Sequence, residues 1–223
     1  MRSVGRVLRP FSPFPAAILA AAIAAISTPP LGAGTVELKN DSVVDFGQVA
    51  IQSGFVAGEL GSAWLTSSCT GDITAVRILW LSASGGVPPV LQEAIRINQA
   101  GSFPVPGPLI REMLGPVMQD GGFNEFQVAP PIPVTSGQTI VVSLLFLSSP
   151  TPGNGPSLCN DTDSCQAGRN GIFANPPGAW FSACTLGVSG DFAIRALVDC
   201  SDNEIFLDGF ESGDTGEWSA TQS

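Results

Sequence analysis

An acidic loop bounded by two cysteines is the stretch of this sequence best suited to chemistry. It runs Cys159-Asn-Asp-Thr-Asp-Ser-Cys165. Hard cations such as Ca²⁺ prefer oxygen ligands, and alternating Asp residues on a short loop can point two carboxylates at one ion. The candidate metal ligands are therefore Asn160, Asp161 and Asp163, with Ca²⁺ as the ion. The competing interpretation is a polar turn whose side chains bind the local backbone, because a full Ca²⁺ shell needs about six to eight oxygens.

Aromatic and planar polar side chains are the candidates for a ligand-binding site. The flat apolar faces of Trp64, Trp180 and Phe181 could stack on a sugar ring. Arg169 and Asn170 lie between glycines and could present hydrogen-bond donors to a carboxylate or a sugar hydroxyl. Each group has a structural alternative. The rings could pack in the core, and Arg169 could hold its loop through carbonyl groups or through an ion pair with a nearby Asp.

The composition excludes several catalytic systems and one class of partner. The chain has no His, which excludes Ser-His-Asp and Cys-His systems in their usual forms and imidazole metal sites. The net charge of −10 argues against nucleic acid, because phosphate contacts need basic clusters. We therefore expect no enzyme, with a hydrolase that uses paired carboxylates as an alternative. Acids on or beside expected strands, none with a flanking motif, are Glu37, Glu59, Asp72, Glu93, Glu125, Asp191 and Asp199.

Residues 1–33 have the features of a secretory signal peptide. Arg2, Arg6 and Arg9 form a positive start, and an apolar run from Phe14 to Ile26 follows. This run is too short to span a bilayer of about 30 Å. We expect cleavage near Ala33, or earlier near Ser27, and no transmembrane segment in the mature chain. The alternative is a helix that stays attached as an anchor. The predicted location is secreted or cell-surface.

An oxidising compartment would allow disulfides among the five cysteines. We expect Cys159 and Cys165 to form a small ring because they are close in sequence. For the long-range bridge we prefer Cys69–Cys184, with Cys69–Cys200 as the alternative. Sequence alone does not fix the connectivity.

Short alternating segments separated by turn residues predict an all-β fold. Gly and Pro number 26 and 19 and lie between apolar runs, where they act as turn residues. This spacing is typical of an antiparallel β-sandwich or jelly roll, which we place at residues 34–200. Leu109–Met118 is the one segment in which we expect a helical turn. The expected strands are Thr35–Lys39, Phe55–Leu60, Ala63–Thr66, Ile73–Leu81, Leu91–Asn98, Glu125–Val128, Thr139–Leu147, Ile172–Ala174, Trp180–Cys184 and Phe192–Val198.

Residues 201–223 form an acidic tail that we expect to be partly disordered. The tail contains Ile205-Phe-Leu-Asp-Gly-Phe-Glu-Ser-Gly-Asp214, followed by Trp218-Ser219. This phrase resembles a short C-terminal signature at the ends of assorted exported proteins of Gram-negative bacteria. The resemblance implies an exported bacterial protein and says nothing of the preceding domain.

The domain itself loosely resembles accessory β-sandwich modules of secreted bacterial proteins. The features that carry the resemblance are Phe55-Val-Ala-Gly-Glu59, Pro133-Val-Thr-Ser-Gly137 and Gly190-Asp-Phe-Ala-Ile-Arg-Ala196. Such modules have no common catalytic residues to carry over. The resulting hypothesis is a non-catalytic binding module for a carbohydrate or a cell-surface partner, stabilised by Ca²⁺ if the acidic loop binds it. The alternative to this hypothesis, besides the hydrolase, is a structural cell-surface protein without a small ligand.

Overall fold

The structure is a computed structural model that describes residues 34–44, 48–81, 91–147 and 157–200. The predicted signal peptide and the acidic tail, including the segment that carries its resemblance, lie outside the described residues. Among the helices that can be described, none has the length and apolar character needed to cross a membrane.

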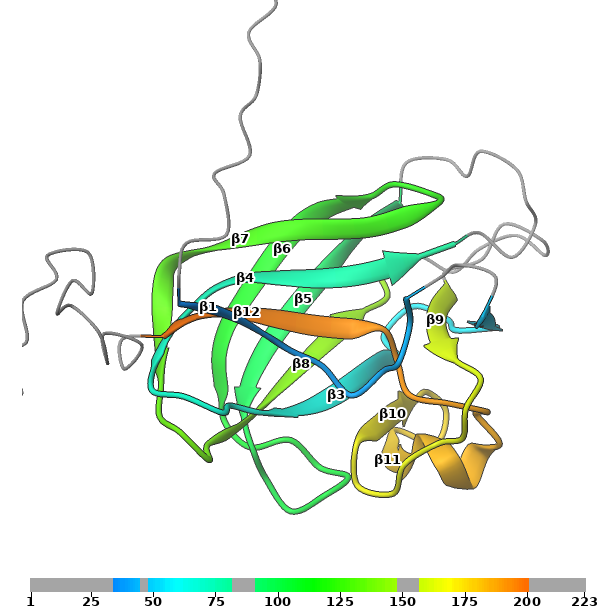
Figure 1. The fold of residues 1–223 in the computed structure, drawn as a ribbon. Helices are drawn as coiled ribbons and strands as arrows, with labels where there is room; N and C mark the ends of the chain where they lie inside the picture. Colours follow the sequence, from blue (N-terminus) through cyan, green and yellow to red (C-terminus); the bar gives the residue numbers. More distant parts are fainter. Residues whose placement is uncertain (1–33, 45–47, 82–90, 148–156, 201–223) are drawn as a thin grey trace, which may run out of the picture. The chain divides into compact units, whose positions relative to one another are not determined.

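The described residues form antiparallel sheets, which confirms the predicted all-β sandwich (Figure 1). Within each sheet, the order given is the order in space. The four-stranded sheet is β1 (Thr35–Leu38), β12 (Ile194–Cys200), β4 (Gly71–Trp80) and β7 (Gly122–Val134). The six-stranded sheet is β11 (Ala179–Ser182), β10 (Asn170–Ala174), β3 (Leu60–Thr66), β8 (Thr139–Leu145), β5 (Leu91–Gln99) and β6 (Leu109–Met118). A separate pair joins β2 (Val49–Ser53) to β9 (Ser157–Asp161), and a 3₁₀ turn, η2, spans Ala183–Leu186.

The main core lies between the two large sheets. Val76, Ile78 and Trp80 of β4 share one face, as their two-residue spacing predicts, and all three are fully buried. They belong to one apolar cluster with Val142 and Leu144 of β8, which lie in the opposite sheet. The facing apolar stripes of the two sheets therefore hold the sandwich together by removing apolar surface from water.

Strand β8 lies between β3 and β5 and is covered on both faces, as its apolar residues on both faces predict. Ile140, Val142 and Leu144 face the main core. Leu145, on the other face, belongs to a second apolar cluster with Leu60 of β3. Part of the outer face of the six-stranded sheet is therefore buried rather than exposed to solvent.

The prediction of a helical turn over Leu109–Met118 is wrong, because this segment is the edge strand β6. It pairs with β5 through two register irregularities. Gly115 has a φ of 83°, and Pro116 cannot donate to a sheet hydrogen bond. An edge strand tolerates both residues because one of its sides has no partner strand. The same two residues obscure the strand period in the sequence.

Other differences concern segments whose pairing is non-local. The strand expected at Ala63–Thr66 is part of β3, which begins at Leu60, whereas the strand expected at Phe55–Leu60 is wrong, because only its last residue lies in a strand. Strands β2 and β9 were not predicted. All five residues of β9 are buried, although they include Asn160 and Asp161, whose polar side chains suggested a loop. The acidic loop therefore starts at Thr162 rather than at Asn160.

Two disulfides form, and the preferred connectivity is wrong. The pairs are Cys69–Cys200 and Cys165–Cys184, with Cα–Cα distances of 5.8 and 5.4 Å. Cys159 is free and buried, because β9 directs it into an apolar cluster with Leu79. The Cys69–Cys200 alternative is confirmed, since Gly71 lies opposite Cys200 in the β4–β12 register. The two disulfides fit an oxidising compartment.

Candidate ligand pocket

An open pocket of about 250 Å³ lies on the outer face of the six-stranded sheet. Its lining comes from strands β3, β5, β8, β10 and β11 and from two loops. The lining residues are Gly58, Leu60, Arg96, Asn98, Pro106, Gly107, Ser143, Phe173 and Trp180.

The strand register explains why these side chains meet. Directly opposed residues of antiparallel strands project to the same face. One row across the sheet is polar, with Ser62 opposite Ser143, Ser143 opposite Arg96, and Arg96 opposite Glu112. The next row on the same face is apolar, with Trp180 opposite Phe173 and Phe173 opposite Leu60. The pocket forms where these two rows adjoin.

Aromatic rings form one wall of the pocket. The rings of Phe173 and Trp180 lie 5.5 Å apart between centroids. Trp64 meets Trp180 edge to face at 6.4 Å and Phe103 at 5.0 Å. Trp64 is only 5% exposed, so it supports the wall from behind. Trp180 is partly exposed and presents its ring to the pocket.

Glycine at position 171 is required for this arrangement of rings. A Cβ atom at Gly171 would lie 2.7 Å from Cζ3 of Trp64, which is closer than van der Waals contact allows. The indole therefore packs directly against the backbone of β10. This close approach links the position of the Trp64 ring, and through it that of Trp180, to the path of β10.

Polar groups occupy the side opposite the rings. Arg96 Nε donates to Oε1 of Glu112 at 2.6 Å, and its terminal amino groups have no hydrogen-bond partner among the described residues. Ser143 Oγ accepts from Ser62 Oγ at 2.7 Å, which leaves the Ser143 hydroxyl proton available to another acceptor. Asn98 donates through Nδ2 to the carbonyl of Gly107 at 2.9 Å, which holds the loop that completes the pocket.

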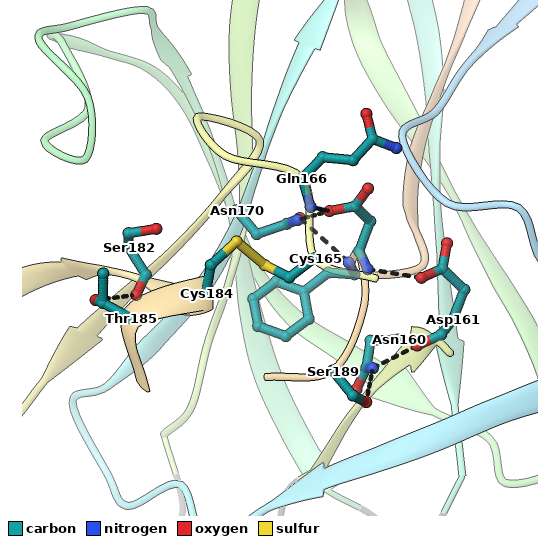
Figure 2. The surroundings of a disulfide bond; sticks show 11 residues. Asn160, Asp161, Cys165, Gln166, Asn170, Ser182, Cys184, Thr185 and Ser189 are labelled. Atoms are coloured by element: carbon teal, nitrogen blue, oxygen red, sulfur yellow. Dashed lines mark hydrogen bonds between the residues drawn. A yellow bond between two sulfur atoms is a disulfide. The ribbon is translucent and has the colours of Figure 1, made fainter. Parts of the chain in front are cut away.

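A buried polar network lies beside the wall and ties β9 to β10 (Figure 2). Asp191, Asp161 and Asn170 are all at most 2% exposed. Oδ1 of Asp191 accepts from the backbone N–H of Gln166 at 3.0 Å and also from Nδ2 of Asn170. Oδ1 of Asp161 accepts from the N–H of Asp191 at 2.8 Å. Together with the Cys165–Cys184 disulfide, these bonds fix the loop that leads into β10.

Two of the three side chains predicted to bind a metal have partners within the fold, and the third is exposed. Asn160 donates to the carbonyl of Asp161 at 2.6 Å and to Ser189 Oγ at 3.1 Å. Asp161 accepts from the N–H of Ser42 at 2.8 Å, whereas Asp163 is exposed. In the part of the chain that the structure describes, no group of three or more acidic, Cys or His side chains is placed to hold a metal ion. Asn160 and Asp161 therefore lie in a strand and bind several groups far away in the sequence, which differs from the local polar turn that was the alternative.

Only part of the predicted ligand site comes together at the pocket. Trp180 lines it, and Trp64 supports Trp180. Phe181 lies opposite the core residue Ile172 and therefore faces away from the pocket. Asn170 is buried in the polar network, and Arg169 is exposed and forms no ion pair with a described residue.

Sequence reasoning missed Arg96, Asn98, Ser143 and Phe173. A signal existed for two of them, because Arg96 and Asn98 lie on the polar face of a segment whose Ile95 and Ile97 share the apolar face. No comparable signal marked Ser143, which lies in an otherwise apolar run, or Phe173. Their role depends on which strands become neighbours.

A second pocket of about 180 Å³ lies on the opposite face of β10, where Ile172 and Ala174 project. Its lining includes Phe55, Ile172 and Val188, all of them buried core residues, together with the exposed Leu186. Because it lacks a pair of partly exposed aromatic rings opposed by a cationic group, it offers fewer means of orienting a polar ligand.

No protein-family model, curated protein or solved structure matches this chain. The functional interpretation therefore depends on the geometry of the pocket.

Proposed function

We propose that this protein is a non-catalytic carbohydrate-binding module of an exported protein, and that the pocket on the six-stranded sheet binds a sugar ring. The observation that carries the proposal is the partly exposed Trp180–Phe173 pair opposed by Arg96, Asn98 and Ser143. A sugar ring has flat patches of C–H groups and a rim of hydroxyls. It therefore suits a site with an aromatic wall on one side and hydrogen-bonding groups on the other.

The polar groups of the pocket have hydrogen-bond donors that are not engaged within the described part of the protein and can serve such a ligand. The guanidinium of Arg96 is a rigid donor fork, and only its Nε is engaged by Glu112. The hydroxyl of Ser143 accepts one hydrogen bond and can donate another. Donors and acceptors on strands are more firmly placed than those on loops, which favours orientation of a small ring.

The lining supports binding rather than hydrolysis. Glycoside hydrolysis by the common mechanisms uses two carboxyl groups about 5–10 Å apart across the scissile bond. The pocket lining contains no Asp or Glu. Export of the protein is supported by the two disulfides and by the predicted signal peptide. The second candidate remains a structural cell-surface protein without a small ligand.

A glycan array with the full chain, produced under oxidising conditions, tests the proposal. Trp180→Ala should weaken binding by at least tenfold, because it removes the exposed ring of the wall. Phe181→Ala is the matched control, since its ring is adjacent in sequence but faces away from the pocket. Thermal unfolding of both variants checks that they fold. Unchanged binding by a folded Trp180→Ala variant would rule out this pocket, and no binding by the wild type would favour the structural role.

The same array with a chelator tests the Ca²⁺ hypothesis. Because Asn160 and Asp161 already have partners within the fold, we expect chelation to leave binding unchanged. Loss of binding in chelator would instead indicate that a bound metal ion is required for binding.

A further inference from the structure

We infer that Glu112, which does not line the pocket, sets the charge preference of the pocket and makes it select neutral over acidic sugars. The inference rests on the proposed function. Arg96 is the one charged residue of the pocket lining. Its pairing with Glu112 determines whether an incoming ligand meets a cation or an ion pair.

The geometry of the pair is well suited to this role. Arg96 and Glu112 lie directly opposite each other on β5 and β6, so the sheet register holds them together. The Nε–Oε1 distance is 2.6 Å, and the two side chains are 36% and 30% exposed. Glu112 approaches the guanidinium from the β6 side, whereas the ligand would approach from the aromatic side.

This arrangement opposes acidic sugars for an electrostatic reason. A guanidinium stays protonated at every physiological pH, so an unpaired Arg96 would attract a uronate or a sulfated sugar. The carboxylate of Glu112 balances that charge and repels a second anion brought to the same guanidinium. A hydroxyl group carries no net charge, and it can accept from the terminal amino groups of Arg96 without this repulsion.

The surrounding charges do not supply an alternative attraction for anions. Glu59, which follows the lining residue Gly58, is an acid and accepts the N–H groups of Val56 and Asn175, each at 2.9 Å. Arg111, the neighbour of Glu112 on β6, donates to the carbonyl of Ala129. The chain as a whole has a net charge of −10. Glu112 therefore balances the positive charge of Arg96, the one charged residue of the pocket lining, in a protein whose net charge is negative.

The test measures dissociation constants for matched sugars with the full chain. The probes are the methyl glycosides of glucose, galactose and mannose and of the three corresponding uronic acids, at low and at high salt. The wild type should prefer the neutral member of the best-binding pair. Glu112→Gln, which keeps an acceptor for Arg96 Nε, should shift the neutral-to-acidic preference toward the acid by about tenfold. The shift should shrink at high salt, because salt screens exposed charges.

Glu125→Gln is the matched control, because Glu125 forms a comparable ion pair with Arg77 at 2.7 Å on the four-stranded sheet. It should leave the preference unchanged. A wild type that prefers uronic acids, or a Glu112→Gln variant with an unchanged preference, would overturn the inference while leaving the carbohydrate site intact. If the wild type binds none of the probes and none of the arrayed glycans, the proposed function itself fails, and this inference fails with it.

Discussion

The carboxylate of Asp191 is fully buried, and only one of its oxygens has a partner. Oδ1 accepts two hydrogen bonds, whereas the buried Oδ2 has none in the described part of the chain. Burial penalises the charged form and raises the pKa of Asp191 above its ordinary value, and the nearby carboxylate of Asp161 adds to this effect. Asp191 therefore holds the loop before β10 through hydrogen bonds, while the burial of its charged form is unfavourable for stability.

This cost predicts how stability depends on pH. A raised pKa means that the folded state binds the proton more tightly than the unfolded state, so stability falls as the pH rises from about 4 through the raised pKa of Asp191. Asp191→Asn should remove this fall. Relative to the wild type, the variant should therefore become progressively more stable as the pH rises through that range.

Urea unfolding at a series of pH values measures this difference. Asp72→Asn, at an exposed position of β4, is the control and should follow the wild type, because Asp72 is not among the charges that raise the pKa of Asp191. A stability difference between Asp191→Asn and the wild type that is flat with pH would show that burial of this charge does not limit stability.

Cys159 is the second residue whose environment predicts its behaviour. Burial raises the pKa of its thiol to about 12, and the thiolate is the reactive form. Iodoacetamide at pH 8 should therefore leave the folded protein unmodified and label one thiol per chain after denaturation. Mass spectrometry of the two samples provides the measurement. Rapid labelling of the folded protein would contradict the burial of Cys159 in the cluster with Leu79.

At the scale of elements, a buried ion pair joins β12 to the segment that follows β1. Arg195 Nε and Nη2 bind the two oxygens of Asp41 at 3.0 and 2.5 Å. Nη1 binds Glu37 at 3.0 Å, and the guanidinium lies 4.3 Å from the ring centroid of Phe123. The side chain of Asp41 is 0% exposed, so its charge depends on Arg195 for compensation.

Arg195→Met should destabilise the protein by about 3–5 kcal/mol, because it leaves the charge of Asp41 buried without an opposite charge beside it. Adding Asp41→Asn removes the orphaned charge and keeps an acceptor for the N–H of Val43. The double variant should therefore recover part of the loss. Urea unfolding of the single and double variants completes the thermodynamic cycle. Strict additivity of the two substitutions would argue against coupling between them.

At the scale of the whole molecule, the two disulfides close loops of very different length. Cys69–Cys200 spans 131 residues and joins the turn before β4 to the end of β12, whereas Cys165–Cys184 spans 19. A longer loop removes more entropy from the unfolded chain. The first disulfide therefore constrains the sandwich as a whole, and the second constrains the region that carries the aromatic wall.

Removing one disulfide at a time should show that stability and ligand binding depend on the two disulfides to different degrees. By loop entropy, Cys69→Ala/Cys200→Ala should cost about 5 kcal/mol and Cys165→Ala/Cys184→Ala about 3 kcal/mol. The second double variant should nevertheless weaken the proposed glycan binding more, because it loosens the loop that leads into β10. Urea unfolding and the glycan array provide the two readouts. The opposite order in binding would indicate that the wall is positioned without this disulfide.

Features that depend on nearest neighbours in the chain could be predicted from the sequence. The two-residue alternation at Val76, Ile78 and Trp80 predicted a buried strand face, and the apolar residues on both faces of β8 predicted a strand covered on both sides. The polar face of β5, which includes Arg96 and Asn98, could also be recognised in the sequence. Trp180 and its ring partner Trp64 were predicted as candidates, whereas its other ring partner, Phe173, was not.

Strand period and composition are local properties, and from them alone an antiparallel all-β chain, the absence of histidine chemistry and a short set of aromatic candidates could be predicted. The tertiary structure decided which strands are neighbours, and with that the pocket, the disulfide pairing and the partners of the acidic residues. Arg96 meets Ser143 only through the β5–β8 register, and Cys69 meets Cys200 only through the β4–β12 register. Register follows from the joint burial of faces from distant segments. The polar residues of β9 looked like a loop because the groups that satisfy them, at Ser42, Ser189 and Asp191, lie far away in the sequence.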